Sequence, residues 1–132
     1  MADRLSDVHG DQRGAGRTDG SRATLRFVGD LDAFTATSLA LDVAEALADR
    51  PAAIEIDLAA TTFIDSAGIQ MLIRAWRLGR GLGVDVVATN VPRTIARAVS
   101  VCGLCGHGPF RDLAAEPRPA WRPLGSGTGL LA

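Results

Sequence analysis

The stretch from Ile54 to Trp76 reads IEIDLAATTFIDSAGIQMLIRAW and contains two different periodicities. Apolar and polar residues alternate over residues 54–58, which is typical of a half-buried β-strand. From about residue 67 to residue 79 the apolar residues recur at helical spacing instead, as Ile69, Leu72, Ile73 and Trp76. This stretch therefore predicts a strand, a polar loop and a helix whose apolar stripe faces a core.

The junction between that strand and that helix carries the most informative polar residues. Ser66 has the residue type and the position of a helix N-cap, whose hydroxyl would accept a hydrogen bond from the amide of Gly68 or Ile69. Gly68 is a poor helix former, so its place in the first turn indicates close approach by another backbone or by a ligand. Caps are commoner than functional sites, and the residues alone leave both explanations of Ser66 open.

The rest of the chain repeats the alternation of strand and helix. Strands are predicted at residues 24–28 and 84–88, and helices at about residues 33–49 and from Pro92 to near Gly103. This succession indicates an α/β fold with a parallel sheet and right-handed crossovers. Every strand-to-helix junction then falls at the carboxyl edge of the sheet, where α/β proteins usually place their sites. Those junctions are residues 29–32, 59–66 and 89–90.

The composition excludes several classes of function. All 14 basic residues are arginine, so no lysine is present for phosphate-loop, Schiff-base or kinase chemistry. A net charge of −1 argues against direct nucleic-acid binding. No apolar run approaches the roughly 20 residues of a membrane helix. The amino terminus has no apolar signal-peptide core, so we expect a cytoplasmic protein.

Both ends of the chain differ from the middle in composition. Residues 1–20 show no apolar periodicity and are predicted to be a flexible leader. Residues 116–132 include three prolines and three glycines and are predicted to be a flexible tail. A single folded domain is expected between them, at residues 21–115.

Cys102, Cys105 and His107 are the other candidates for chemistry. They make a poor zinc site, because such a site needs three or four well-placed ligands and the only other histidine, His9, lies in the predicted leader. The cysteine pair also ends a predicted helix, where a thioredoxin-like pair would begin one. Hydrolase chemistry at Ser66 would need a G-x-S-x-G turn, whereas position 64 is Ile. We therefore predict no enzyme activity, no cofactor and no metal site, and leave a redox role for the cysteines open.

Three segments carry motifs that occur together. Residues 57–72 read DLAATTFIDSAGIQML, with Asp65 and Ser66 at the centre, residues 29–32 read GDLD, and residues 91–104 read VPRTIARAVSVCGL. Together they resemble the STAS domain family, which includes the anti-sigma factor antagonists. The first resembles the family signature, the second the segment before its first helix, and the third its third helix. The resemblance covers about residues 22–110. It implies a small mixed sheet of about four or five strands, mostly parallel after an initial antiparallel hairpin and flanked by helices.

That resemblance also implies a function in protein–protein switching. In antagonists of this family, an anti-sigma factor that is also a serine kinase phosphorylates the serine that matches Ser66. The unphosphorylated antagonist binds the anti-sigma factor and releases the sigma factor, and a phosphoserine phosphatase is expected to restore this form. The alternative is a STAS interaction module in another complex, for signalling or lipid transport, in which Ser66 is only a helix cap.

The residues expected to flank Ser66 or to bind the partner come from the same junctions and from the helix that follows. Many family members carry a second hydroxyl residue where this chain has Ala67, so Ser66 is the acceptor in the motif. Met71 is expected to point away from the core, as is Leu78. Incompletely covered sheet edges would also allow a homodimer. The predicted set comprises Asp30, Asp32, Asp65, Ala67, Gly68, Met71 and Arg74.

Overall fold

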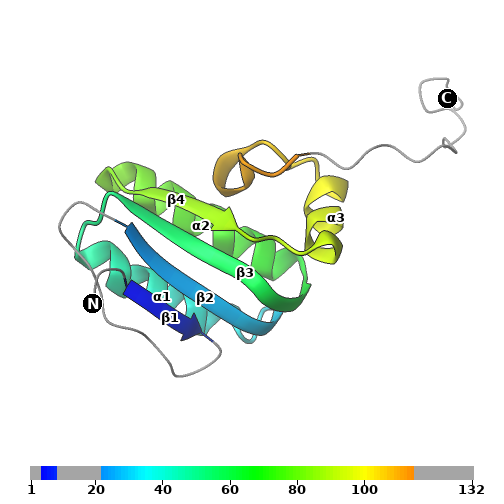
Figure 1. Cartoon of the computed structure of the whole chain (residues 1–132), viewed down its shortest axis with the longest axis horizontal. Helices are drawn as coiled ribbons and strands as arrows, with labels where there is room; N and C mark the ends of the chain where they lie inside the picture. The colour runs from blue at the N-terminus through cyan, green and yellow to red at the C-terminus, as the bar shows by residue number, and fades with distance from the viewer. Residues whose placement is uncertain (1–3, 9–21, 115–132) are drawn as a thin grey trace, which may run out of the picture.

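The computed structural model describes residues 4–8 and 22–114, which form one sheet with helices around it (Figure 1). The predicted alternation of strand and helix is confirmed across most of this region. The elements in chain order are β1 (Arg4–Val8), β2 (Arg22–Leu31), α1 (Ala36–Ala48), β3 (Ala53–Ile64), α2 (Ser66–Leu82), β4 (Asp85–Thr89), α3 (Arg93–Val101) and the short 3-10 helix η1 (Gly108–Phe110).

The described strands lie in the order β1-β2-β3-β4, and every neighbouring pair is parallel. The α/β class and the strand number agree with the prediction. The expected antiparallel hairpin is wrong for the described residues, because β1 runs parallel to β2, with Arg4 opposite Ala23 and Val8 opposite Phe27. Strand β1 also falls inside the predicted leader. The rest of that leader and the predicted tail at residues 116–132 lie outside the described residues.

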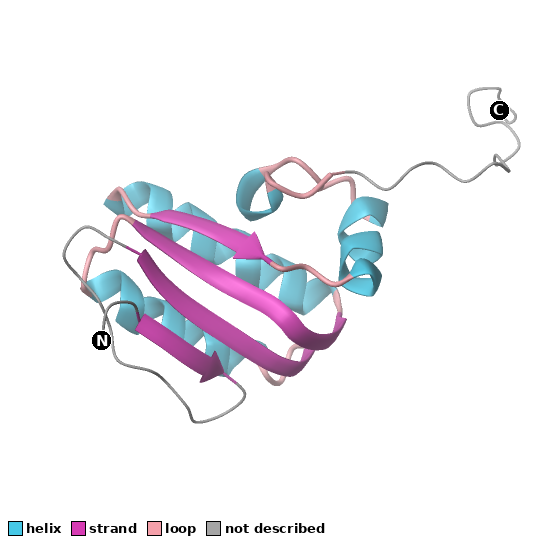
Figure 2. Ribbon diagram, viewed as in Figure 1, coloured by secondary structure: helices cyan, strands magenta, loops and turns pink. Residues whose placement is uncertain are grey.

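The core lies between the sheet and helices α1 and α2, which cover the same face of the sheet (Figure 2). Alternate residues of β2 and β3 point into it, because successive side chains of a strand face opposite sides. Helices α1 and α2 contribute apolar side chains at helical spacing. The buried set includes Leu25, Phe27, Ile54 and Ile56 from the strands and Leu39, Val43 and Leu72 from the helices.

Strand β3 continues well beyond β4 toward the carboxyl edge of the sheet. It pairs with β4 only as far as Asp57, opposite Thr89, but it pairs with β2 as far as Ile64, opposite Leu31. The β2–β3 register shifts twice in this extension, and at each shift β3 holds one extra residue. Such bulges bend a strand and increase its twist. The ends of β2 and β3 therefore project together as a curved two-stranded ribbon (Figure 1).

Helix α2 begins directly against the end of β2, and Gly68 makes this contact possible. A Cβ atom at residue 68 would collide with the Leu31 carbonyl oxygen and would lie 2.9 Å from Ile64 Cγ1. The Leu31 carbonyl also accepts a hydrogen bond from the Asp65 amide at 3.3 Å. The close backbone approach predicted from Gly68 is therefore confirmed, and the approaching backbone is that of β2.

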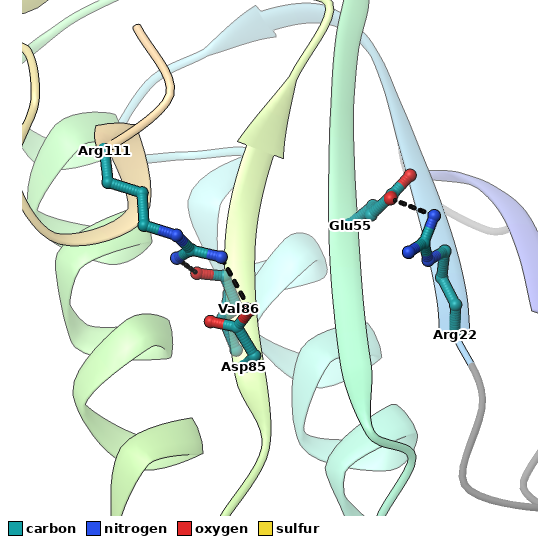
Figure 3. Close-up of polar contacts among 5 residues, drawn as sticks. All are labelled: Arg22, Glu55, Asp85, Val86 and Arg111. Atoms are coloured by element: carbon teal, nitrogen blue, oxygen red, sulfur yellow. Dashed lines mark hydrogen bonds and ion pairs between the residues drawn. The ribbon is translucent and has the colours of Figure 1, made fainter.

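The segment after α3 returns to the outer edge of β4. Phe110 of η1 is buried, and the Arg111 guanidinium binds the Asp85 carboxylate at 2.6 Å and donates to the Val86 carbonyl at 3.5 Å (Figure 3). Figure 3 also shows an ion pair of 2.8 Å between Arg22 of β2 and Glu55 of β3. The described residues of this segment form one 3-10 turn, which ends at Phe110.

We expect Gly68→Ala to lower the free energy of unfolding by about 1–3 kcal/mol, because the added methyl group forces the first turn of α2 away from Leu31. Gly81→Ala is a matched control in the same helix, since a Cβ atom at that position meets nothing within 4 Å. This control should raise stability by about 0.4–1 kcal/mol. Urea denaturation of the two variants and the parent measures both effects, and equal stability of the two variants would contradict the contact.

Candidate functional site

The candidate site is the carboxyl edge of the sheet, where the ends of β2 and β3 meet the starts of α1 and α2. Leu31 and Ile64, the last residues of β2 and β3, are paired in register. Asp32 and Asp65, which follow them directly, therefore lie at neighbouring strand ends. The Thr62 hydroxyl donates to the Asp30 carboxylate at 2.6 Å and joins the two strand ends. The junction at residues 89–90 is set back from this point, because Thr89 pairs with Asp57, roughly 20 Å earlier along β3.

Asp65, and not Ser66, is the N-cap of α2. The Asp65 backbone is extended, with φ −114° and ψ −174°, and its carboxylate accepts a hydrogen bond from the Gly68 amide at 3.0 Å. Ser66 is the first residue of the helix, so the predicted capping role of its hydroxyl is wrong. Aspartate and serine cap equally well, and the residue at which the chain turns helical decides between them.

The Ser66 side chain is exposed at the start of α2. Within residues 4–8 and 22–114 the structure records no hydrogen bond of its hydroxyl. The site thus contains a serine hydroxyl that the described fold does not use, next to a carboxylate that the fold does use.

We expect Asp65→Ala to lower the free energy of unfolding by about 1 kcal/mol, because the Gly68 amide loses its acceptor. Asp65→Asn should lose only a small part of this, since asparagine caps about as well as aspartate. Ser66→Ala, one residue away, should leave stability close to that of the parent. Chemical denaturation of the three variants tests this assignment, and a loss in Ser66→Ala as large as that in Asp65→Ala would return the cap to Ser66.

Asp32 organises the turn that leads into α1. Its Oδ1 atom accepts hydrogen bonds from the amides of Phe34 and Thr35, each at 3.0 Å, and from the Thr35 hydroxyl at 3.2 Å. The same hydroxyl donates to the Asp30 carbonyl at 2.6 Å. The Thr35 amide is the main cause of a lowered pKa of the Asp32 carboxyl, with the Thr35 hydroxyl and the Phe34 amide adding to it against the effect of desolvation. Asp32 is therefore held as a carboxylate beside Ser66.

The lowered pKa means that the charged form of Asp32 stabilises the folded state above the ordinary aspartate pKa, and that this contribution is lost as the pH falls through the folded-state value. We expect Thr35→Val to raise the pKa of Asp32 part of the way to its ordinary value, because the backbone amides still donate. Thr62→Val should leave it unchanged, since Thr62 binds Asp30 instead. An NMR titration of the Asp32 carboxyl carbon measures both, and an ordinary pKa in the parent would contradict the turn.

A shallow groove runs between α1 and α2 next to Ser66. One wall of the groove consists of small side chains from α1 and the turn before it. The other wall consists of Ala67 and longer side chains from α2. Met71 is only 7% exposed, so the prediction that it points away from the core is wrong, although its side chain does line this groove. Arg74 is exposed, and so is Leu78, as predicted. The groove is lined by Ala33, Ala36, Thr37, Ala40, Ala67, Gln70, Met71 and Arg74.

The carboxyl edge carries negative charge that the described cations do not neutralise. Asp30, Asp32 and Asp65 take part in no ion pair within the described part of the chain. The ion pairs resolved on the sheet join Arg22 to Glu55 and Arg111 to Asp85, away from these three carboxylates. A surface of this kind favours a partner that brings positive charge.

Sequence reasoning missed four residues that shape this edge. Thr35 and Thr62 hold the loops through their hydroxyls, and the spacing of Asp32 and Thr35 is a recognisable signal for a local side-chain turn. Phe34 and Phe63 are exposed, although aromatic residues usually bury most of their area. Phe63 could have been found from the alternation of β3, in which it precedes the buried Ile64.

The remaining candidates for chemistry lie apart from this edge. Cys102 and Cys105 are free thiols beyond the end of α3, and Cys105 Sγ lies 3.9 Å from the Ala96 carbonyl oxygen. No group of three or more His, Cys, Asp or Glu residues in the described ranges is arranged to hold a metal ion. None of the helices formed by these residues has both the length and the apolar character of a membrane span.

Comparison with known proteins agrees with this architecture. A family model described as "Mlab, STAS domain" matches residues 15–112. The chain is 36% identical over 67 residues to a protein named "Anti-sigma-F factor antagonist RsfB", found in two strains of Mycobacterium tuberculosis. This match covers 50% of the chain and 55% of that protein, so the chain spans about half the length of the curated relatives it matches.

The family match extends over well more than half of the chain and includes both strand-to-helix junctions of the site. The chain belongs to the STAS domain family.

Proposed function

We propose that this protein is an anti-sigma factor antagonist that is switched off by phosphorylation of Ser66. In its unphosphorylated form it binds an anti-sigma factor with serine kinase activity, and the sigma factor is released. The observation that carries the proposal is the exposed Ser66 hydroxyl, which has no hydrogen-bond partner among the described residues because Asp65 provides the helix cap. The similarity to a protein named as an anti-sigma-F factor antagonist supports the same role.

The position of Ser66 suits a switch that leaves the fold intact. A phosphate adds about −1.5 to −2 charges, and at the first residue of a helix these charges meet free amides and the positive end of the helix dipole. Phosphorylation does not remove the N-cap, because the cap belongs to Asp65. The folded state therefore tolerates the modification, and its effect falls on the partner surface.

That effect is electrostatic repulsion and steric bulk at one point of the surface. The phosphate stands next to Asp65 and close to Asp32, on an edge with three carboxylates and no paired cation among the described residues. A partner surface that accommodates three carboxylates must then also accommodate a dianion. The groove that begins at Ala33 and Ala67 is the adjoining surface for the same partner.

The remaining parts of the proposal follow from this chemistry. ATP and the catalytic groups come from the partner kinase, since this chain has no lysine to bind ATP phosphates, and we assign it a binding role and not a catalytic one. A phosphoserine phosphatase resets the switch, and an ATP-dependent cycle of this kind places the protein in the cytoplasm. The second candidate is a STAS interaction module without a phosphoswitch, in which Ser66 would only cap helix α2. It is less favoured because Asp65, and not Ser66, is the N-cap of that helix.

We expect mass spectrometry to find one phosphate, on Ser66, after incubation with the cognate anti-sigma factor and ATP. Ser66→Ala should bind the anti-sigma factor in the presence or absence of ATP, and Ser66→Asp should bind at least about tenfold more weakly, as expected for a charge buried without a counter-charge. Thr94→Val is the matched control, because it removes an exposed hydroxyl from the first turn of another helix, α3, and it should be phosphorylated like the parent.

Two results would contradict the proposal in different ways. Tight, ATP-independent binding with no phosphate on Ser66 supports the interaction module without a switch. Equal affinity of Ser66→Asp and the parent shows that charge at this position does not control the complex.

A further inference from the structure

Two phenyl rings stand in solvent at the same edge as Ser66. Phe34, in the turn before α1, is 90% exposed, and Phe63, near the end of β3, is 51% exposed. Among residues 22–114, the other large exposed apolar residues lie on the helices and not in the carboxyl-edge turns: Leu41 on α1, Leu78 and Leu82 on α2, and Val101 at the end of α3. Exposed aromatic rings gathered at one functional edge are a feature of interaction surfaces.

Both rings are attached to the strand ends that carry the site carboxylates. Phe63 pairs in register with Asp30, and the Phe34 amide donates to the Asp32 carboxylate at 3.0 Å. Leu31 and Ile64, between these residues, bring the two strand ends together. The rings and the carboxylates are therefore attached to adjacent backbone segments at the carboxyl edge, next to the start of α2.

The backbone that carries the rings is held firmly by side-chain hydrogen bonds. The contacts between Asp32 and Thr35 fix the turn of Phe34, and the contact between Thr62 and Asp30 fixes the strand that carries Phe63. A phenylalanine side chain has only two rotatable bonds, so ordering it on a rigid backbone costs little conformational entropy. Aromatic residues presented in this way are typical binding hot spots.

The surrounding charge limits the kind of partner. Asp30, Asp32 and Asp65 form no ion pair with the described cations, so a bare apolar surface would leave them desolvated and unpaired. A complementary partner offers apolar pockets for the rings and Arg or Lys side chains for the carboxylates. A second copy of this chain would instead bring its own three carboxylates to the contact, if the same edges met.

We infer that Phe34 and Phe63 are the apolar anchors with which this protein docks into a basic-rimmed pocket of the anti-sigma factor. The inference rests on the proposed function and names the side chains that supply its affinity. Phosphate on Ser66 then acts beside the anchors, on the charged part of the surface. Because the anchors are uncharged, they act mainly on the dissociation rate, whereas the carboxylates make association depend on salt concentration.

The test is the affinity of the unphosphorylated full-length protein for its cognate anti-sigma factor, measured by titration calorimetry at two salt concentrations. Phe34→Ala and Phe63→Ala should each weaken binding about tenfold or more at both salt concentrations, as hot-spot truncations do. Leu41→Ala and Val101→Ala remove apolar side chains that are 66% and 87% exposed elsewhere, and they should change affinity less than about threefold. Circular dichroism and urea denaturation verify that each variant folds like the parent.

The kinase reaction gives a second readout. The anchors do not carry the accepting hydroxyl, so Phe34→Ala should raise KM for phosphorylation of Ser66 and leave kcat nearly unchanged. If the parent binds tightly but both phenylalanine variants bind equally well, the inference is overturned and the proposed function stands. If the parent neither binds nor is phosphorylated, the proposed function itself fails. Loss of self-association without loss of anti-sigma factor binding would assign the rings to a contact between copies and overturn the inference.

Discussion

The geometry of the carboxyl edge depends on one carbonyl group, that of Leu31 at the end of β2. It accepts the Asp65 amide and lies directly against the Cα atom of Gly68, with no side chain between them. The first turn of α2 is thereby fixed to the last residue of β2. Asp32, the next residue along the chain, then starts its own turn beside Ser66. A single backbone contact thus sets the spacing between the carboxylate turn and the candidate phosphoacceptor.

The elements that dominate the fold could be predicted because their periodicities are unambiguous. Strands β2 and β3 alternate in polarity, and α2 has an apolar stripe at helical spacing, so the fold class, the element order and the edge that carries the candidate site follow from the sequence. The close backbone approach at Gly68 could also be predicted, since a glycine in the first turn of a helix indicates that another group lies where a side chain would be. These features depend on local sequence alone.

The parts that could not be predicted depend on tertiary contacts. Met71 is buried because α2 packs against both the sheet and α1, whereas the helical pattern of α2 alone indicated one buried face. Strand β1 has only five residues and gains its order by pairing with β2, which no local pattern reveals. Asp65 and Ser66 are both good caps, and the end point of the β2–β3 ladder determines which residue stands first. The bulges of β3 likewise leave no clear signal in composition.

Under the proposed function, the division of roles between Asp65 and Ser66 explains how one motif can serve both structure and signalling. Asp65 satisfies an amide of the helix, and Ser66 contributes a hydroxyl that the described structure does not require. A residue that is not needed for folding can be modified without loss of the domain. Neighbouring positions in the chain can therefore meet separate requirements, one thermodynamic and one regulatory.

The contact of Arg111 with β4 bears on how the sheet behaves at high concentration. An edge strand exposes unpaired backbone groups, and these can recruit a strand from another molecule into a growing cross-β assembly. Here the Arg111 guanidinium donates a hydrogen bond to the Val86 carbonyl. The bulky, charged side chain therefore lies where an incoming strand would have to pair with β4. The same short segment that buries Phe110 thus protects the chain against edge-to-edge aggregation on the β4 side.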